Sequence, residues 1–188
     1  VPATIFLATA YLDSTEPFPF DNWQPIVSRQ ECRDAWIPMT REQCRAALAS
    51  GLIEFGCHTH THQVFRDRPA EFLQDLTTSV DVLRHDFHID HPPFSFPFGI
   101  ADEALVAAAR QTDITCGLGT TPTLVATHSD PFTWGRFGVS ESETAGALIV
   151  KLSGWYDAVR QIARPVRPGR PTAKPVSPTC SPAAGIPS

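Results

Sequence analysis

Segments typical of strands alternate with segments typical of helices along most of this 188-residue chain, and this order restricts the fold more than any other feature. The strand-like segments are short and apolar, and the helix-like segments repeat apolar residues every three or four positions. We expect strands within 3–9, 52–57, 94–99 and 114–118, and helices within 40–51, 69–87, 102–110 and 140–162. This alternation is typical of an α/β fold in which helices cover a parallel sheet.

Capping residues indicate where the helices begin. Thr40 and Gln43 match a capping box, Pro69 suits a first helical turn, and Asp102 suits an N-cap. The letters "SESE" at 140–143 predict a second capping box. The strand at 3–9 has no charged residue, so we expect both of its faces to be buried. We expect two buried helical stripes, one of Phe72, Leu73, Leu76, Val80, Leu83 and Phe87, and one of Leu148, Leu152, Trp155, Val159 and Ile162.

The composition fits a globular domain and excludes two classes of partner. Hydrophobic residues make up 42% of the chain and charged residues 19%, enough apolar material for a core. The net charge of −5 leaves no basic surface to neutralise phosphates, which argues against nucleic acid. No run approaches the ~18 consecutive apolar residues of a membrane span. From residue 165 onward Pro, Ser and Ala dominate, which predicts one domain at 1–164 and a disordered tail or linker at 165–188.

The cysteines do not form a recognisable framework. They are odd in number, scattered, and without a CxxC pair: Cys32, Cys44, Cys57, Cys116 and Cys180. This pattern favours reduced thiols over disulfides and therefore a reducing compartment such as the cytoplasm. It also argues against a structural zinc knuckle.

Three histidines alternate in "GCHTHTHQ", directly after the strand expected at 52–57. Ligands of parallel α/β folds bind outside the carboxyl ends of the strands, so His58, His60 and His62 lie where a site is expected. A continued strand would place all three on one face. A helical turn, which we favour, would place His58 and His62 together and turn His60 away. The alternatives to a metal site are a histidine-rich surface loop and a histidine bonded within the core.

The same stretch resembles the H-[ST]-x-x-H motif of the polysaccharide deacetylases, the NodB homology domain or carbohydrate esterase family 4. "VPATIFLAT" at the start of the chain is similar to the second strand of that family, and "FSFPFG" resembles its Pro-aromatic segment. The resemblance extends from residue 1 to about 164. It implies a distorted (β/α) barrel that, in this chain, lacks the family's first strand.

The resemblance also implies roles for individual residues. His58 and His62 would bind a divalent metal, most simply zinc, and Thr59 holds the Ser/Thr position of the motif. Pro97 and Phe98 would line the substrate groove, and the backbone N–H of Phe98 would help bind the oxyanion. The implied substrate is an N-acetylated polysaccharide, from which acetyl groups are removed by hydrolysis. The aromatic ring of Trp134 is a further candidate for stacking on sugar rings.

Three elements of the family pattern are missing. The aspartates of its first motif, a catalytic base and a metal ligand, would precede residue 1. Ser95 stands where the family has an arginine, and Arg136 is a candidate to replace that arginine from a neighbouring strand. His128 is the one late histidine available as a general acid, although its surroundings do not match the family motif. Solvated surface side chains are the alternative for both Arg136 and His128.

We therefore expect a metal-dependent polysaccharide deacetylase whose 188 residues, taken alone, bind metal weakly and turn over little or no substrate. Its rival is a non-catalytic carbohydrate-binding or scaffold domain that keeps the fold. A third hypothesis is a two-histidine metal site with no enzymatic role.

Overall fold

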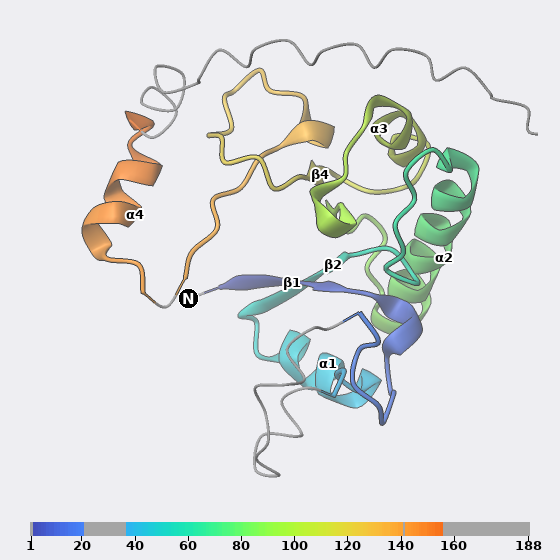
Figure 1. The fold of residues 1–188 in the computed structure, drawn as a ribbon. Coiled ribbons are helices and arrows are strands. Elements are labelled where there is room, and N and C mark those ends of the chain that lie inside the picture. The colour runs from blue at the N-terminus through green and yellow to red at the C-terminus, as the bar shows by residue number, and fades with distance from the viewer. Residues whose placement is uncertain (1, 21–36, 141, 156–188) are drawn as a thin grey trace, which may run out of the picture.

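The computed structural model describes residues 2–20, 37–140 and 142–155, and it has the predicted α/β architecture (Figure 1). Within these residues one sheet contains four parallel strands in the order β1-β2-β3-β4: β1 (Ala3–Leu7), β2 (Ile53–Cys57), β3 (Phe94–Ser95) and β4 (Gly117–Leu118). A parallel bridge between Leu118 and Trp134 continues the sheet beyond β4. Because all strands run the same way, the segments that follow them meet at one edge.

The longest pairing in the sheet joins β1 to β2, from Ala3 opposite Ile53 to Leu7 opposite Cys57. The prediction that both faces of the first strand are buried is wrong at its amino end, where Ala3 and Thr4 are exposed. There Thr4 donates a hydrogen bond of 3.0 Å from its hydroxyl to the carboxylate of Glu54 on the neighbouring strand. Burial increases toward the carboxyl end, so the histidine segment follows the well-packed end of the strand pair.

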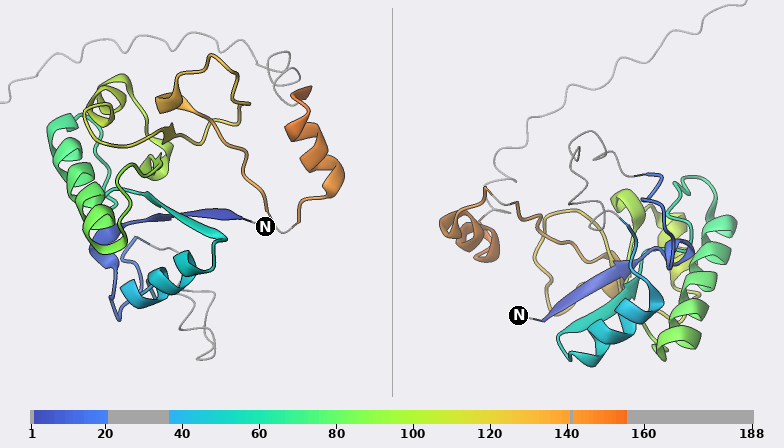
Figure 2. Two further views of the ribbon diagram at one scale, coloured as in Figure 1. Left: turned by 180° about the vertical axis from the view of Figure 1, so that it is seen from behind. Right: turned by 90° about the horizontal axis from the view of Figure 1, so that it is seen from below.

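Three helices begin where the capping residues predict: α1 (Arg41–Ala49), α2 (Pro69–Phe87) and α3 (Glu103–Ala109). The Thr40 hydroxyl accepts from the Gln43 N–H, and the Gln43 side chain accepts from the Thr40 N–H, which confirms the capping box. The Asp102 carboxylate caps α3 by accepting from a backbone N–H. Figures 1 and 2 show α1 beneath the β1–β2 pair, with α2 and α3 packed side by side.

The core lies between α2 and the sheet. The ring of Phe72 contacts those of Phe65, Phe94 and Phe96 at centroid distances of 5.7 to 6.1 Å. The predicted stripe of α2 is confirmed, with one member, Leu73, only partly buried. The helix thereby fixes the strand ends from which the candidate site is built.

The last described helix differs from the prediction. α4 runs Ala145–Leu152 with Thr144 as its N-cap, later than the start predicted near Ser140, and it buries no residue. Leu152 and Trp155, predicted to belong to a buried stripe, are 61% and 69% exposed. Figures 1 and 2 show α4 set apart from α2 and α3. Helical periodicity correctly indicated a helix but not whether a partner covers its apolar face.

Several predictions fall outside the described residues. These are the tail at 165–188, the domain boundary at 164, and the stripe positions Val159 and Ile162. Among the residues that are described, no helix combines the length and the apolar character required to cross a membrane.

Candidate metal and substrate site at the carboxyl edge of the sheet

The imidazole rings of His58 and His62 face each other beyond the carboxyl end of β2. Their centroids lie 4.7 Å apart, with 59° between the ring planes. His60 turns away from this pair, and its Nδ1 lies 2.9 Å from the Thr9 hydroxyl oxygen. The outer two histidines therefore converge and the middle one diverges, as a turn predicts and a continued strand does not.

Two residues of this histidine loop (residues 58–62) adopt left-handed backbone conformations. The φ angle is +64° at Thr59 and +54° at His62. This region is unfavourable for residues other than glycine, and especially for a β-branched threonine. The fully buried Thr59 hydroxyl accepts a hydrogen bond of 3.1 Å from the His62 N–H, which closes the turn. The turn thus brings the two rings together at a cost in backbone strain.

His58 is held as a neutral ring with one free nitrogen. Its Nδ1 lies 2.7 Å from the carbonyl oxygen of Ser95, which can only accept, so Nδ1 carries the proton. Burial lowers the pKa of His58 to about 4; the bond to Ser95 opposes this shift, and the charges of His62 and Arg136 add to it. A neutral imidazole with its Nε2 lone pair available is the form that binds a metal ion.

The ring of His62 lies between two phenylalanine rings. Phe20 stacks on it at a centroid distance of 3.9 Å, and Phe98 contacts it at 4.8 Å. Burial lowers the pKa of His62 as well. Its Nδ1 is buried and has no hydrogen-bond partner among the described residues. An unpaired buried nitrogen is costly, which fits a side chain that serves a ligand.

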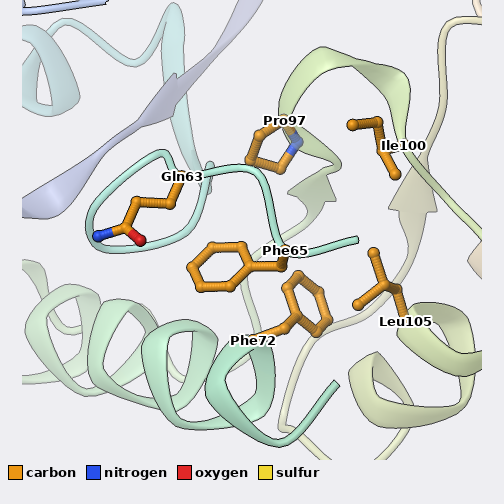
Figure 3. Close-up of a pocket in the computed structure, with 6 residues that line it drawn as sticks. All are labelled: Gln63, Phe65, Phe72, Pro97, Ile100 and Leu105. Carbon is orange, nitrogen blue, oxygen red and sulfur yellow. The ribbon is translucent and has the colours of Figure 1, made fainter. Parts of the chain in front are cut away.

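The Pro97–Phe98 pair follows β3 and lies beside the histidines. Pro97 is buried, whereas the Phe98 side chain is 55% exposed and has a left-handed φ of +56°. The N–H of Phe98 finds no acceptor among the described residues. Figure 3 shows a small cavity beside Pro97, lined by Gln63, Phe65, Phe72, Pro97, Ile100 and Leu105. Phe65, Phe72 and Leu105 of this lining are buried core residues.

Of the candidates after β4, Arg136 bonds to a residue beside His58. Arg136 donates a hydrogen bond of 3.0 Å from Nη1 to the hydroxyl of Ser95. Trp134 pairs with Leu118 through its backbone, and its buried indole N–H has no partner among the described residues. His128 lies in an exposed turn.

The described side chains do not complete a metal site. His58 and His62 offer two convergent nitrogens, and a catalytic zinc usually takes three protein ligands and a water. In the described part of the chain, no group of three or more His, Cys, Asp or Glu side chains is arranged to hold a metal. Cys57 is not a ligand candidate, because its thiol is fully buried and burial raises its pKa to about 12.

Sequence inspection missed the groups that support the loop. Asp75 of α2 and the 3-10 turn Thr9–Tyr11 both bond to it, and Phe20 covers it. The sequence gives one weak indication for Asp75, because this charged residue directly precedes Leu76 on the buried side of an amphipathic helix. The roles of Thr9 and the Ser95 carbonyl depend on contacts 37 or more residues apart in sequence, which no local pattern reveals.

The sequence and the fold are both similar to those of known proteins. A family model described as polysaccharide deacetylase matches residues 1–117. The fold is similar to that of a de-N-acetylase from Aggregatibacter actinomycetemcomitans, with a TM-score of 0.63 and 16% identity, over 80% of this chain and 64% of that one. A polysaccharide deacetylase from Bacillus cereus has a similar fold, with a TM-score of 0.62 and 14% identity. The match covers 81% of this chain and 42% of that one.

A third structure, a Streptococcus pyogenes deacetylase in complex with acetate, gives a TM-score of 0.61 and 14% identity, over 80% of this chain and 58% of that one. The chain thus spans between about two fifths and two thirds of the length of these structures. No curated protein sequence matches it.

Proposed function

Because this chain belongs to the polysaccharide deacetylase family, we propose that the protein is a metal-dependent hydrolase that removes N-acetyl groups from a polysaccharide. The observation that carries the proposal is the convergence of the His58 and His62 rings, 4.7 Å apart, at the edge of a parallel sheet where ligands bind. The similar fold of solved deacetylases supports the same conclusion.

The two imidazoles suit zinc, which binds neutral histidine nitrogens. A divalent ion held there would lower the pKa of a bound water to about 7 and draw charge from the acetyl carbonyl. The Ser95 carbonyl keeps His58 in the tautomer that presents Nε2, and burial keeps the ring neutral at pH 7. These are requirements for a ligand, and both are met before any ion binds.

Phe98 and Arg136 are proposed to act on the substrate side of the site. The Phe98 N–H, with no acceptor among the described residues, is the donor we assign to the oxyanion that develops during amide hydrolysis. Its exposed ring offers a surface for a sugar. Arg136 lies near enough to His58 to lower its pKa and is proposed to orient an acidic group there.

The general base and third ligand are not supplied by the described residues, so we propose weak metal binding and little turnover for these 188 residues alone. His128, exposed in a turn, remains the weakest of the proposed catalytic residues. A protonated group would still be required to donate to the departing amine.

Zinc binding to the 188-residue chain tests the proposal. In equilibrium dialysis with ⁶⁵Zn²⁺, we expect His58→Ala and His62→Ala to abolish the weak binding of the unaltered chain. His60→Ala is the matched control, because it lies in the same loop and its ring faces Thr9. Equal binding by all four proteins would contradict the assignment. Acetate release from an N-acetylated glucosamine polymer, measured on the complete gene product, then tests the reaction itself.

A non-catalytic carbohydrate-binding domain is the second candidate, favoured by the lack of a third ligand among the described residues. The coding sequence upstream of Val1 discriminates between the two. A "TFDDG"-like stretch in frame supports the enzyme, and a start codon directly before Val1 supports the binding domain.

A further inference from the structure

The carboxylate of Asp75 makes three hydrogen bonds to the histidine loop. Its Oδ2 accepts from the backbone N–H of His60 at 2.6 Å and from that of Thr61 at 3.0 Å. Its Oδ1 accepts from the Thr61 hydroxyl at 2.6 Å. Both oxygens are therefore engaged by the segment between the two converging histidines.

Three backbone carbonyls of the loop accept hydrogen bonds from the turn after β1. The 3-10 turn after β1 donates from the Thr9 N–H to the Thr59 carbonyl at 3.4 Å, and from the Ala10 N–H to the His60 carbonyl at 2.9 Å. The Tyr11 hydroxyl donates to the Thr61 carbonyl at 3.1 Å. The loop thus has three of its carbonyls held by this turn and two of its N–H groups held by Asp75.

These bonds matter because the loop is strained. Left-handed conformations at Thr59 and His62 persist only where the surroundings favour them. Hydrogen bonds to a charged carboxylate are stronger than bonds between neutral groups, and Asp75 supplies three of them at the middle of the turn. No other carboxylate among the described residues bonds to this loop.

We propose that Asp75 is a positioning residue that holds the histidine loop in the conformation in which His58 and His62 converge. It acts through the backbone N–H groups of His60 and Thr61 and the Thr61 hydroxyl, to which its two carboxylate oxygens are bonded. The inference rests on the proposed function only for the metal-binding role of His58 and His62. The role of Asp75 in holding the loop stands on the hydrogen bonds themselves.

Other acidic residues of α2 have different partners, which makes them suitable controls. Asp81 pairs with Arg84 on the same helix, 3.2 Å away, and its side chain is half exposed. Asp81→Asn removes a carboxylate from the same helix without touching the loop. Thr61→Val removes one of the three bonds to Asp75, and Thr61→Ser restores the hydroxyl that makes it.

The experiment combines amide hydrogen exchange with zinc dialysis on the 188-residue chain and its variants. In Asp75→Ala we expect the amide hydrogens of His60 and Thr61 to exchange at least roughly tenfold faster, as the loss of a hydrogen bond predicts. The amide hydrogen of Leu83, in the buried part of α2, should be unchanged. Zinc affinity should fall roughly 10–100-fold, the usual effect of losing a group that orients metal ligands.

Thr61→Val should give a smaller acceleration in the same direction, Thr61→Ser should behave as the unaltered chain, and so should Asp81→Asn. Unchanged exchange at His60 and Thr61 in Asp75→Ala would overturn the inference, as would an acceleration of the same size in Asp81→Asn. If Asp75→Ala does not fold, the contrast between Thr61→Val and Thr61→Ser decides in its place. If the unaltered chain binds no zinc, the proposed metal site fails, and the exchange rates still decide the role of Asp75.

Discussion

The histidine loop (58–62) and the segment after β4 (119–155) are built in opposite ways. In the loop, Thr59 is fully buried in a strained backbone conformation. Hydrogen bonds to α2 and to the turn after β1 hold the loop in place. In the later segment, none of the described residues is buried, and α4 exposes its apolar side chains. Arg136 of this segment donates a hydrogen bond to the hydroxyl of Ser95, whose carbonyl lies against His58.

This difference follows the extent of the match to the family. The part that matches the deacetylase family ends at residue 117, and it contains the core, both converging histidines and the groups that support them. Beyond it the chain adds a parallel bridge and one charged side chain to the site. Substitutions of one residue type in the two regions should therefore have very different consequences.

The largest contrast is expected between two leucines. Leu83 of α2 is completely buried, and Leu152 of α4 is 61% exposed. Leu83→Ala should lower the free energy of unfolding by about 2–5 kcal/mol, because it removes buried methyl groups and leaves a cavity. Leu152→Ala should change it by less than about 0.5 kcal/mol. Urea titrations followed by circular dichroism measure both, and an equal loss in the two variants would remove the distinction between the regions.

An effect of similar or smaller size should follow from acidifying the metal-free protein. The folded pKa of His58, about 4, lies below its ordinary value of 6.5, so the unfolded chain binds a proton more readily. The neutral ring contributes on the order of 3 kcal/mol to the free energy of unfolding. This contribution is fully present above pH 6.5 and is lost as the pH falls toward 4. The free energy of unfolding, measured at a series of pH values with a chelator present, should fall with this slope between pH 6.5 and pH 4.

His58→Gln supplies the control for that slope, since the amide does not titrate in this range. The difference between the unfolding free energies of the two proteins should shrink as the pH falls from 6.5 to 4. Parallel profiles would show that the ring is not kept neutral by burial.

The smallest of the three effects compares two glycines. A Cβ added at Gly56 in β2 would lie 2.6 Å from the Pro93 carbonyl oxygen and 2.7 Å from the Phe6 ring, whereas one at Gly138 would meet nothing within 4 Å. Gly56→Ala should therefore destabilise the fold by about 1–3 kcal/mol through overpacking, and Gly138→Ala should be close to neutral. Thermal melts of the two variants test this, and a neutral Gly56→Ala would mean that the strands beside the loop can separate freely.

Much of the fold follows from local sequence. The capping residues Thr40 and Asp102 and the apolar spacing of the 69–87 helix predicted real helices, because these signals act within one turn. The spacing of His58 and His62 similarly predicted their convergence. Their metal-binding role remains a prediction.

The errors come from interactions between distant segments. The burial of β1 and of α4 depends on what covers them, which periodicity along a single element does not encode. The support that Asp75 gives the loop crosses from one helix to a turn 14 residues earlier, and Phe20 reaches His62 across 42 positions of sequence. Such contacts are decided by packing in three dimensions.

The buried thiol of Cys57, the residue before His58, has a practical consequence. With its pKa near 12 and no solvent exposure, it is almost entirely protonated and inaccessible at neutral pH. Alkylating reagents can reach it only when the strand that carries the histidines opens. The rate at which iodoacetamide labels this position would therefore measure how often the sheet opens locally at β2.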